Sequence, residues 1–205
     1  MSKLDLNHID DVHFDVLKEI GNIGAGNATT ALSQMINKRV DMKVPKVELL
    51  DFNELANIVG GPENLVVGIL LTLEGEISGM MMFMLEQKSA HNLVNLLMGK
   101  NIDDFSSFTD MDISALQEIG NIISGAYLYS LSTLTNLMIK QSVPYMAIDM
   151  AGAILSVPAI EFGKIGDKAL LIQSQFGEEE INVDGYFILI PTMESYDTIL
   201  NSLGM

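Results

Sequence analysis

Apolar and polar residues recur with the period of an α-helix in two long segments of the chain, residues 10–36 and 110–138. This spacing collects the apolar side chains on one face of each helix. An Asp or Thr near Asp10 and near Asp110 is suited to cap the two N-termini. The pattern therefore predicts one long amphipathic helix in each half of the chain.

Shorter apolar runs follow each predicted helix. A strand is expected around a proline, Pro45 in the first half and Pro144 in the second. Two further runs of strand length then come in each half, joined by an acidic turn; they cover 65–73, 76–85, 168–176 and 181–190. The Met-rich run GMMMFML within the second of them predicts a buried strand. A short helical pattern closes each half, at 91–99 and at 196–204.

The two halves also resemble each other residue by residue. Residues 17–33 (LKEIGNIGAGNATTALS) and 116–132 (LQEIGNIISGAYLYSLS) are identical at nine of 17 positions. The register continues to Val44-Pro45 and Val143-Pro144, which match at the same offset of 99 residues. Self-similarity at a fixed offset indicates a duplicated structural unit.

We therefore predict an α+β fold made by tandem duplication. Two helix–strand–hairpin–helix units, about 10–100 and 109–205, are expected to share one β-sheet with pseudo-two-fold symmetry. The whole chain, 1–205, is expected to form a single domain.

The repeated segment places polar residues on one face of each predicted helix. Four positions recur on that face: Asp15, Glu19, Asn22 and Gly26 in the first copy, and Ser114, Glu118, Asn121 and Gly125 in the second. Glu and Asn three residues apart are neighbours on a helix surface. The shared glycines and isoleucines are also explained by close packing of the two helices against each other. Close packing does not explain an outward Glu and Asn in both copies. A single pair of this kind would usually be two solvent-exposed side chains without a function.

A carboxylate beside a carboxamide favours binding and positioning over complete catalysis. The Glu can pair with Lys or Arg, or act as a base. The Asn offers one acceptor and two donors, which suits it to hold a water molecule in line with an electrophile, as a Gln does in GTPases. Neither residue completes a hydrolytic site, so a partner would have to bring the electrophile and any metal.

Composition narrows the class of partner. The formal net charge of −16 argues against nucleic acid. The absence of cysteine excludes disulfides and thiolate chemistry, and His8, His13 and His91 are too scattered to pair as metal ligands.

No apolar run reaches the roughly 18 residues of a membrane helix, and the first 17 residues lack the pattern of a signal peptide. We expect a cytoplasmic protein that is not embedded in a membrane.

The repeated positions resemble a known family motif, [D/S]-x3-E-x2-N in two copies. The matching residues are Asp15, Glu19 and Asn22, and Ser114, Glu118 and Asn121. The chain thereby resembles the CheC family of chemotaxis phosphatases, whose motif CheX and the flagellar-switch protein FliY share. The resemblance implies that each helix docks on the phosphorylated response regulator CheY. Each Asn would orient water toward the aspartyl phosphate, and each Glu would pair with a regulator Lys. The regulator would supply Mg²⁺, and the chain would need no cofactor of its own.

The resemblance also implies a second partner, the chemoreceptor deamidase CheD. The segment YMAIDMAGAIL (145–155) would bind it, with Asp149 as the one charge in an apolar run. An Asp at a strand end or a helix cap is an equally good reading of that position. Two alternative functions stay open: a non-catalytic adaptor that binds phosphorylated CheY and regulates CheD, and a flagellar-motor component. The resemblance places the protein near chemoreceptors or the motor.

Overall fold

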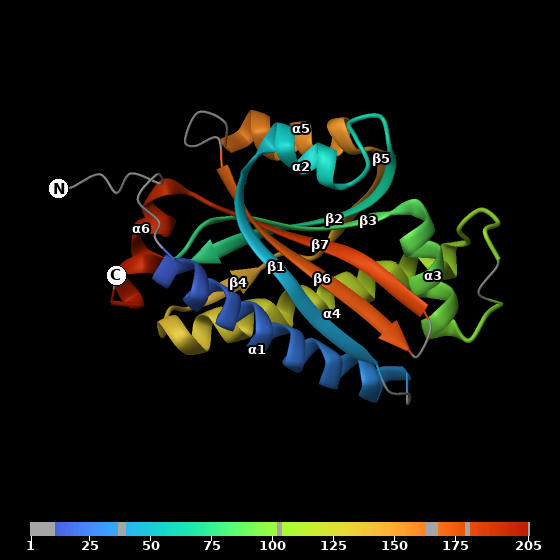
Figure 1. Cartoon of the computed structure of the whole chain (residues 1–205), viewed down its shortest axis with the longest axis horizontal. Helices are drawn as coiled ribbons and strands as arrows, with labels where there is room; N and C mark the ends of the chain where they lie inside the picture. The colour runs from blue at the N-terminus through green and yellow to red at the C-terminus, as the bar shows by residue number, and fades with distance from the viewer. Residues whose placement is uncertain (1–10, 37–39, 102–103, 163–167, 179–180, 205) are drawn as a thin grey trace.

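The computed structural model describes residues 11–36, 40–101, 104–162, 168–178 and 181–204 (Figure 1). Helices and strands alternate along the chain in this order: α1 (Asp11–Ile36), β1 (Asp41–Asp51), α2 (Phe52–Ile58), β2 (Leu65–Gly75), β3 (Gly79–Glu86), α3 (Gln87–Met98), α4 (Asp110–Thr135), β4 (Ile139–Gln141), β5 (Tyr145–Met150), α5 (Ala151–Phe162), β6 (Lys168–Glu178), β7 (Ile181–Pro191) and α6 (Met193–Ser202). The two predicted long helices are present as α1 and α4, and the two predicted hairpins as β2–β3 and β6–β7.

Within the described residues, seven strands form one antiparallel sheet that interleaves the two halves of the chain. Its order is β1-β6-β7-β3-β2-β4, and β5 also pairs with β2. The two halves meet at the centre, where β3 pairs with β7 and Phe83 lies opposite Phe187. An antiparallel sheet with helices on its faces confirms the predicted α+β class.

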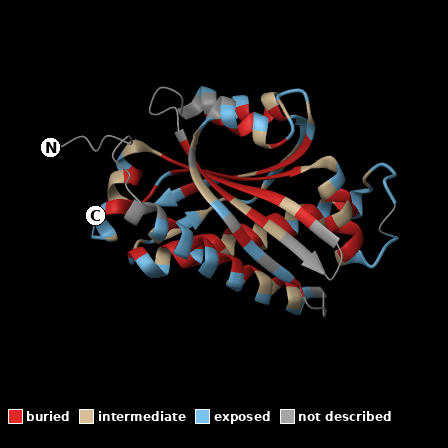
Figure 2. Cartoon of the chain, viewed as in Figure 1, coloured by how far each residue is buried: buried red, intermediate tan, exposed pale blue. Residues whose placement is uncertain are grey.

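Helices cover both faces of the sheet. In Figure 1, α1 and α4 lie on one face and α2 and α5 on the other. Side chains alternate along β3, so Met81 and Phe83 join the core under α1 and α4 while Met82 joins the core under α2 and α5. Figure 2 shows the central strands buried along most of their length. The Met-rich run is therefore a buried strand, as predicted.

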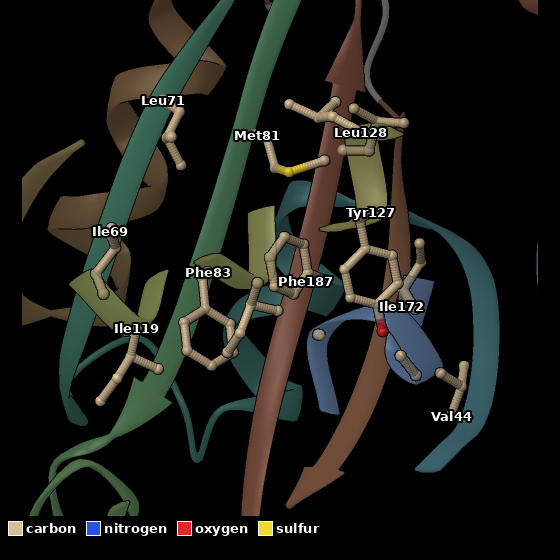
Figure 3. Close-up of a cluster of buried hydrophobic side chains, with 14 of the residues drawn as sticks. Val44, Ile69, Leu71, Met81, Phe83, Ile119, Tyr127, Leu128, Ile172 and Phe187 are labelled. Carbon is tan, nitrogen blue, oxygen red and sulfur yellow. The ribbon is translucent and has the colours of Figure 1, made fainter. Parts of the chain in front are cut away.

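An aromatic stack attaches α4 to the sheet (Figure 3). The ring of Tyr127 lies 4.6 Å from that of Phe187, which in turn lies 5.1 Å from Phe83. The Tyr127 hydroxyl shares a 2.9 Å hydrogen bond with Ser174 Oγ on β6. Burial raises the pKa of Tyr127 to about 12, so this hydroxyl stays protonated across the neutral range. The stack and the hydrogen bond together fix where α4 sits.

The predicted strand around Pro144 is instead two short strands, β4 and β5, with Pro144 between them. Proline has no N–H to give to a ladder, so it interrupts the pairing with β2. In the first half, β1 continues through Pro45 and changes register between Lys43 and Lys46. Among the described strands, β1 pairs only with β6, so its other edge has no neighbouring strand that would need a backbone N–H from β1. An edge strand of this kind can contain a proline.

Two helices lie in segments for which the sequence pattern predicted none. They are α2 and α5, which follow β1 and β5. The α5 sequence AGAILSVPAI is apolar on all sides, so it carries no helical period to recognise. The second long helix ends at Thr135, three residues before the predicted end, because Asn136 takes the left-handed conformation with φ of 57°.

A capping box holds the start of α4, at the position predicted for the second helix; Asp10, predicted near the first cap, lies outside the described residues. Thr109 Oγ accepts from the Asp112 N–H at 3.3 Å, and Asp112 Oδ2 accepts from the Thr109 N–H at 3.0 Å. The buried Asp112 carboxylate also forms an ion pair with Lys100. Burial raises the pKa of Asp112, but the hydrogen bonds from Lys100 and Thr109 outweigh it and hold the pKa below its ordinary value of 3.8.

We predict that Asp112→Asn lowers the free energy of unfolding by about 1–2 kcal/mol at pH 7, the range found for lost helix caps. A depressed folded-state pKa stabilises the fold above pH 3.8, and this contribution is lost as the pH falls through the folded pKa. The difference from wild type should therefore shrink below pH 3.8. Urea unfolding at several pH values measures it.

The control is Asp110→Asn, which removes the same charge from an exposed position of the same helix turn. It should change stability by less than about 0.5 kcal/mol. Equal effects of the two substitutions would contradict the role given to the capping box.

Candidate functional site

The two repeated polar faces lie on the outer surface of a helix pair. α1 and α4 pack against each other and run in opposite directions across the sheet (Figure 1). Their apolar sides are buried against the sheet, and their outer sides carry the exposed positions (Figure 2). The predicted site residues Asp15, Glu19, Asn22, Ser114 and Glu118 are exposed, and Asn121 is half-buried.

The glycine inside each E-I-G-N-I segment seats its helix on the sheet. A Cβ on Gly21 would lie 3.3 Å from Val44 Cγ1 of β1. A Cβ on Gly120 would lie 2.7 Å from Ile69 Cδ1 of β2. The repeated glycine is therefore explained by helix–sheet contact. The two helices meet instead at Gly24, where a Cβ would lie 2.6 Å from Tyr127 Cδ1, and Gly24 is not one of the glycines that the two copies share.

The glycine one turn beyond each Asn has a different role. A Cβ on Gly26 would meet no atom within 4 Å, so packing inside the chain does not require glycine there. Because Gly26 has no side chain, the helix surface beside Asn22 is left uncovered. At Gly125 the space is less open, because a Cβ there would lie 3.8 Å from Gln141 Nε2.

In the first pair, the functional groups have no partner within the described part of the chain. The side chains of Glu19 and Asn22 are exposed and make no hydrogen bond or ion pair there, and neither does Asp15. A carboxylate held in this way is free to bind a cation from another molecule. The neighbouring carboxamide keeps all its donors and its acceptor for a water or an anion.

The second pair differs at the Asn. Glu118 is exposed and unpaired within the described residues, like Glu19. Asn121 Oδ1, however, accepts a 2.8 Å hydrogen bond from Gln141 Nε2 of β4. Sequence reasoning missed Gln141, because no motif encodes a side-chain contact between residues 20 positions apart. The sequence held one indirect signal of this difference between the copies: the repeat offset aligns Gln141 with Met42, so the two residues differ in chemistry.

Asp149 lies apart from both helix faces. It is the penultimate residue of β5, which leads toward α5 on the other side of the sheet from α1 and α4 (Figure 1). Its exposed carboxylate accepts a 2.8 Å hydrogen bond from the N–H of Met150. The structure therefore groups Glu19 and Asn22 on α1, groups Glu118 and Asn121 on α4, and leaves Asp149 at the sheet edge.

The described residues contain neither a metal-binding cluster nor a membrane-spanning helix. Among them, no cluster of three or more His, Asp or Glu side chains is placed to hold a metal ion. No helix in the described ranges is both long enough and apolar enough to cross a bilayer. Each Glu/Asn pair can bind a cation and orient a water or an anion, and the electrophile has to come from a bound molecule.

Comparison with known proteins points to one family. The model of the CheC-like family matches residues 12–49 and 111–145. The chain is 33% identical to the CheY-P phosphatase CheC of Bacillus subtilis, over 97% of each protein. It is 29% identical to the flagellar motor switch phosphatase FliY of the same organism, over 68% of this chain and 36% of that protein. The crystal structure of Thermotoga maritima FliY has the same fold, with a TM-score of 0.76, 19% identity, and coverage of 96% of this chain and 98% of that one.

We predict opposite effects for two glycine substitutions on α1. Gly24→Ala should lower the free energy of unfolding by about 1–3 kcal/mol, because the new methyl group overlaps the Tyr127 ring. Gly26→Ala should leave stability unchanged or raise it by up to about 1 kcal/mol, because alanine favours a helix and the space is open. Denaturant unfolding of both variants measures this. A destabilised Gly26→Ala variant would show that packing inside the chain fixes that glycine.

Proposed function

The chain belongs to the CheC-like family, and we propose that it is a phosphatase that hydrolyses the aspartyl phosphate of the chemotaxis response regulator CheY. The two Bacillus subtilis relatives described above are phosphatases by name, and CheC aligns with almost the whole chain. The observation that carries the proposal is the Glu/Asn pair repeated on the outer faces of α1 and α4, in which both Glu side chains and Asn22 are exposed and Asn121 is half-buried. The reaction is proposed to take place in the cytoplasm, the location expected from the sequence.

Asn22 and Asn121 are proposed to position the attacking water. The water oxygen forms a bond to phosphorus while the bond from phosphorus to the regulator's aspartate oxygen breaks. Orthophosphate leaves with the protons of the water, and the aspartate carboxylate is regenerated. A carboxamide is too weak a base to take a proton, so its contribution is to hold the water in line through hydrogen bonds.

Glu19 and Glu118 are proposed to fix the docked regulator through a salt bridge to a lysine. Each carboxylate is exposed and unpaired within the described residues, so it loses no partner of its own when the regulator binds. Its three-residue spacing from the Asn sets how far the amide lies from that anchor. Asp15 and Ser114 occupy the preceding turn and border the contact.

Mg²⁺ is expected to come with the regulator rather than from a site on this chain. Bound beside the phosphoryl group, it would neutralise the negative charge there. The chain then has to supply only the docking carboxylate and the water-positioning amide.

We further propose that the two sites descend from one duplicated unit related by pseudo-two-fold symmetry. Reversing the strand order β1-β6-β7-β3-β2-β4 exchanges each strand with its counterpart in the other half, which supports this. Such symmetry would explain why both Glu/Asn pairs lie on the same surface, one on each of two antiparallel helices. Each pair would receive one regulator molecule.

CheD is proposed to bind at β5. Among the described strands, β5 pairs with β2 alone, so its outer edge can accept another strand. Asp149 is exposed there, between the exposed apolar residues Ile148 and Met150. An edge that combines apolar contacts with one charge fits a specific protein partner.

Alanine substitution of the two Asn residues tests the proposed reaction. Asn22→Ala and Asn121→Ala should each remove one working site, and the double variant should lose phosphate release from phosphorylated CheY by a factor on the order of 10² or more. Quenched time-course assays of phosphate release, with the chain at catalytic concentration, measure this loss. Circular dichroism checks that each variant is folded.

Full activity in the folded double variant would contradict the proposal. An adaptor function would appear as tight binding of phosphorylated CheY by the wild-type chain without phosphate release, even with CheD present.

We predict that Asp149→Lys weakens binding to CheD at least tenfold, because it reverses the charge at the centre of the proposed surface. Phosphate release measured without CheD should stay unchanged, since β5 lies away from α1 and α4. Glu194→Lys makes the same charge change on α6 and serves as the control. Equal CheD affinity for wild type and Asp149→Lys in calorimetry would place the CheD surface elsewhere.

A further inference from the structure

The hydrogen bond from Gln141 to Asn121 makes the two Glu/Asn pairs structurally unequal. Gln141 Nε2 donates to Asn121 Oδ1 at 2.8 Å, and Asn121 is half-buried. Asn22, at the same place in the first copy, is exposed and has no hydrogen-bond partner within the described residues. The residue aligned with Gln141 at the repeat offset is Met42, whose thioether has no N–H to donate.

Gln141 is held on a strand that is fixed at both ends. Gln141 lies opposite Leu73 of β2. Just after it, the Ser142 N–H donates to the Thr72 carbonyl at 3.0 Å, and Ser142 Oγ accepts from the Thr72 N–H at 3.0 Å. Just before β4, Glu76 Oε2 accepts from the Met138 N–H at 2.7 Å. The backbone that carries Gln141 is therefore well anchored.

The stability of the fold does not explain a glutamine at this position. Gln141 Oε1 is buried and has no hydrogen-bond partner among the described residues. An acceptor that loses its water without gaining a donor destabilises the folded state. An apolar residue of similar length, as at Met42 in the first copy, would avoid that cost. A buried polar group with this cost calls for another role, and among the described residues the side chain of Gln141 has Asn121 as its one hydrogen-bond partner.

We propose that Gln141 is a positioning residue that fixes the Asn121 carboxamide before the regulator docks; this inference rests on the function proposed above. The bond from Gln141 occupies one lone pair of Asn121 Oδ1 and holds the plane of the amide. The other lone pair and the two Nδ2 hydrogens remain for the attacking water and the phosphoryl oxygens. Asn22 has to be ordered during docking, whereas Asn121 is ordered beforehand, which lowers the entropy lost on reaching the transition state.

The test isolates each site by removing the other Asn. In an Asn22→Ala background only the second site works, and Gln141→Met there should lower kcat for phosphate release roughly three- to tenfold while KM changes less than about twofold. In an Asn121→Ala background only the first site works, and Gln141→Met should leave both constants unchanged. The thermal unfolding midpoint of Gln141→Met should equal or exceed that of wild type, because the unpartnered buried oxygen is gone.

Gln141→Glu adds a second measurement, the pH dependence of kcat. A substitution at a residue with a purely structural role would not change that pH dependence. A carboxylate cannot donate to Asn121 Oδ1, but a protonated carboxyl can. In the Asn22→Ala background, the ratio of kcat for Gln141→Glu to kcat for Gln141 should therefore rise as the pH falls. Dividing by the kcat of the enzyme that keeps Gln141, measured at the same pH, removes the pH dependence of the regulator itself.

Three results would overturn the inference. One is an unchanged kcat for Gln141→Met in the Asn22→Ala background. Another is an equal loss in both backgrounds, which would reveal a general structural effect. The third is a pH-independent Gln141→Glu ratio. Failure of the proposed function is distinguishable from these, because it would appear as phosphate release that persists without both Asn22 and Asn121, or as none in the wild type; either would remove the basis of the inference as well.

Discussion

The close approach of α1 and α4 to the sheet is the contact on which both candidate sites depend. Gly21 and Gly120 allow it, because a Cβ at either position would press on Val44 or Ile69. With the apolar side of each helix seated in this way, the Glu and Asn three residues apart must face outward. The Tyr127 stack on Phe187 then fixes α4 against the centre of the sheet. A repeated sequence thus becomes two polar faces on one surface.

The same motif is set in two different surroundings. β1 is continuous beside α1, whereas a proline divides its counterpart into β4 and β5. The short β4 brings Gln141 to Asn121, and the separate β5 presents Asp149 at an edge of the sheet. Both β1 and β5 lie at an edge of the sheet, so the feature that accompanies the interruption at Pro144 and that the first half lacks is the supported amide. We infer that the two copies share one chemistry but differ in how much order each has before a partner arrives.

Periodicity explains what could be predicted from the sequence. The helical period identified α1 and α4 and their outward Glu19, Asn22 and Glu118, and runs of β-forming residues located the two hairpins. The helix α5 carried no such signal, because it is apolar all round. The pairing of Gln141 with Asn121 depends on how a strand lies beside a helix. Contacts of that kind are set by tertiary structure, and no local pattern reports them.

The proposed phosphatase turns over phosphorylated CheY rather than only binding it. The most direct measurement is the amount of orthophosphate released per molecule of wild-type chain, with phosphorylated CheY in large excess and its spontaneous hydrolysis subtracted. We predict many phosphates per chain, well above the two that one passage through each site could give. Release that stops at or below two per chain, or phosphorylated CheY that decays no faster than alone, would contradict it.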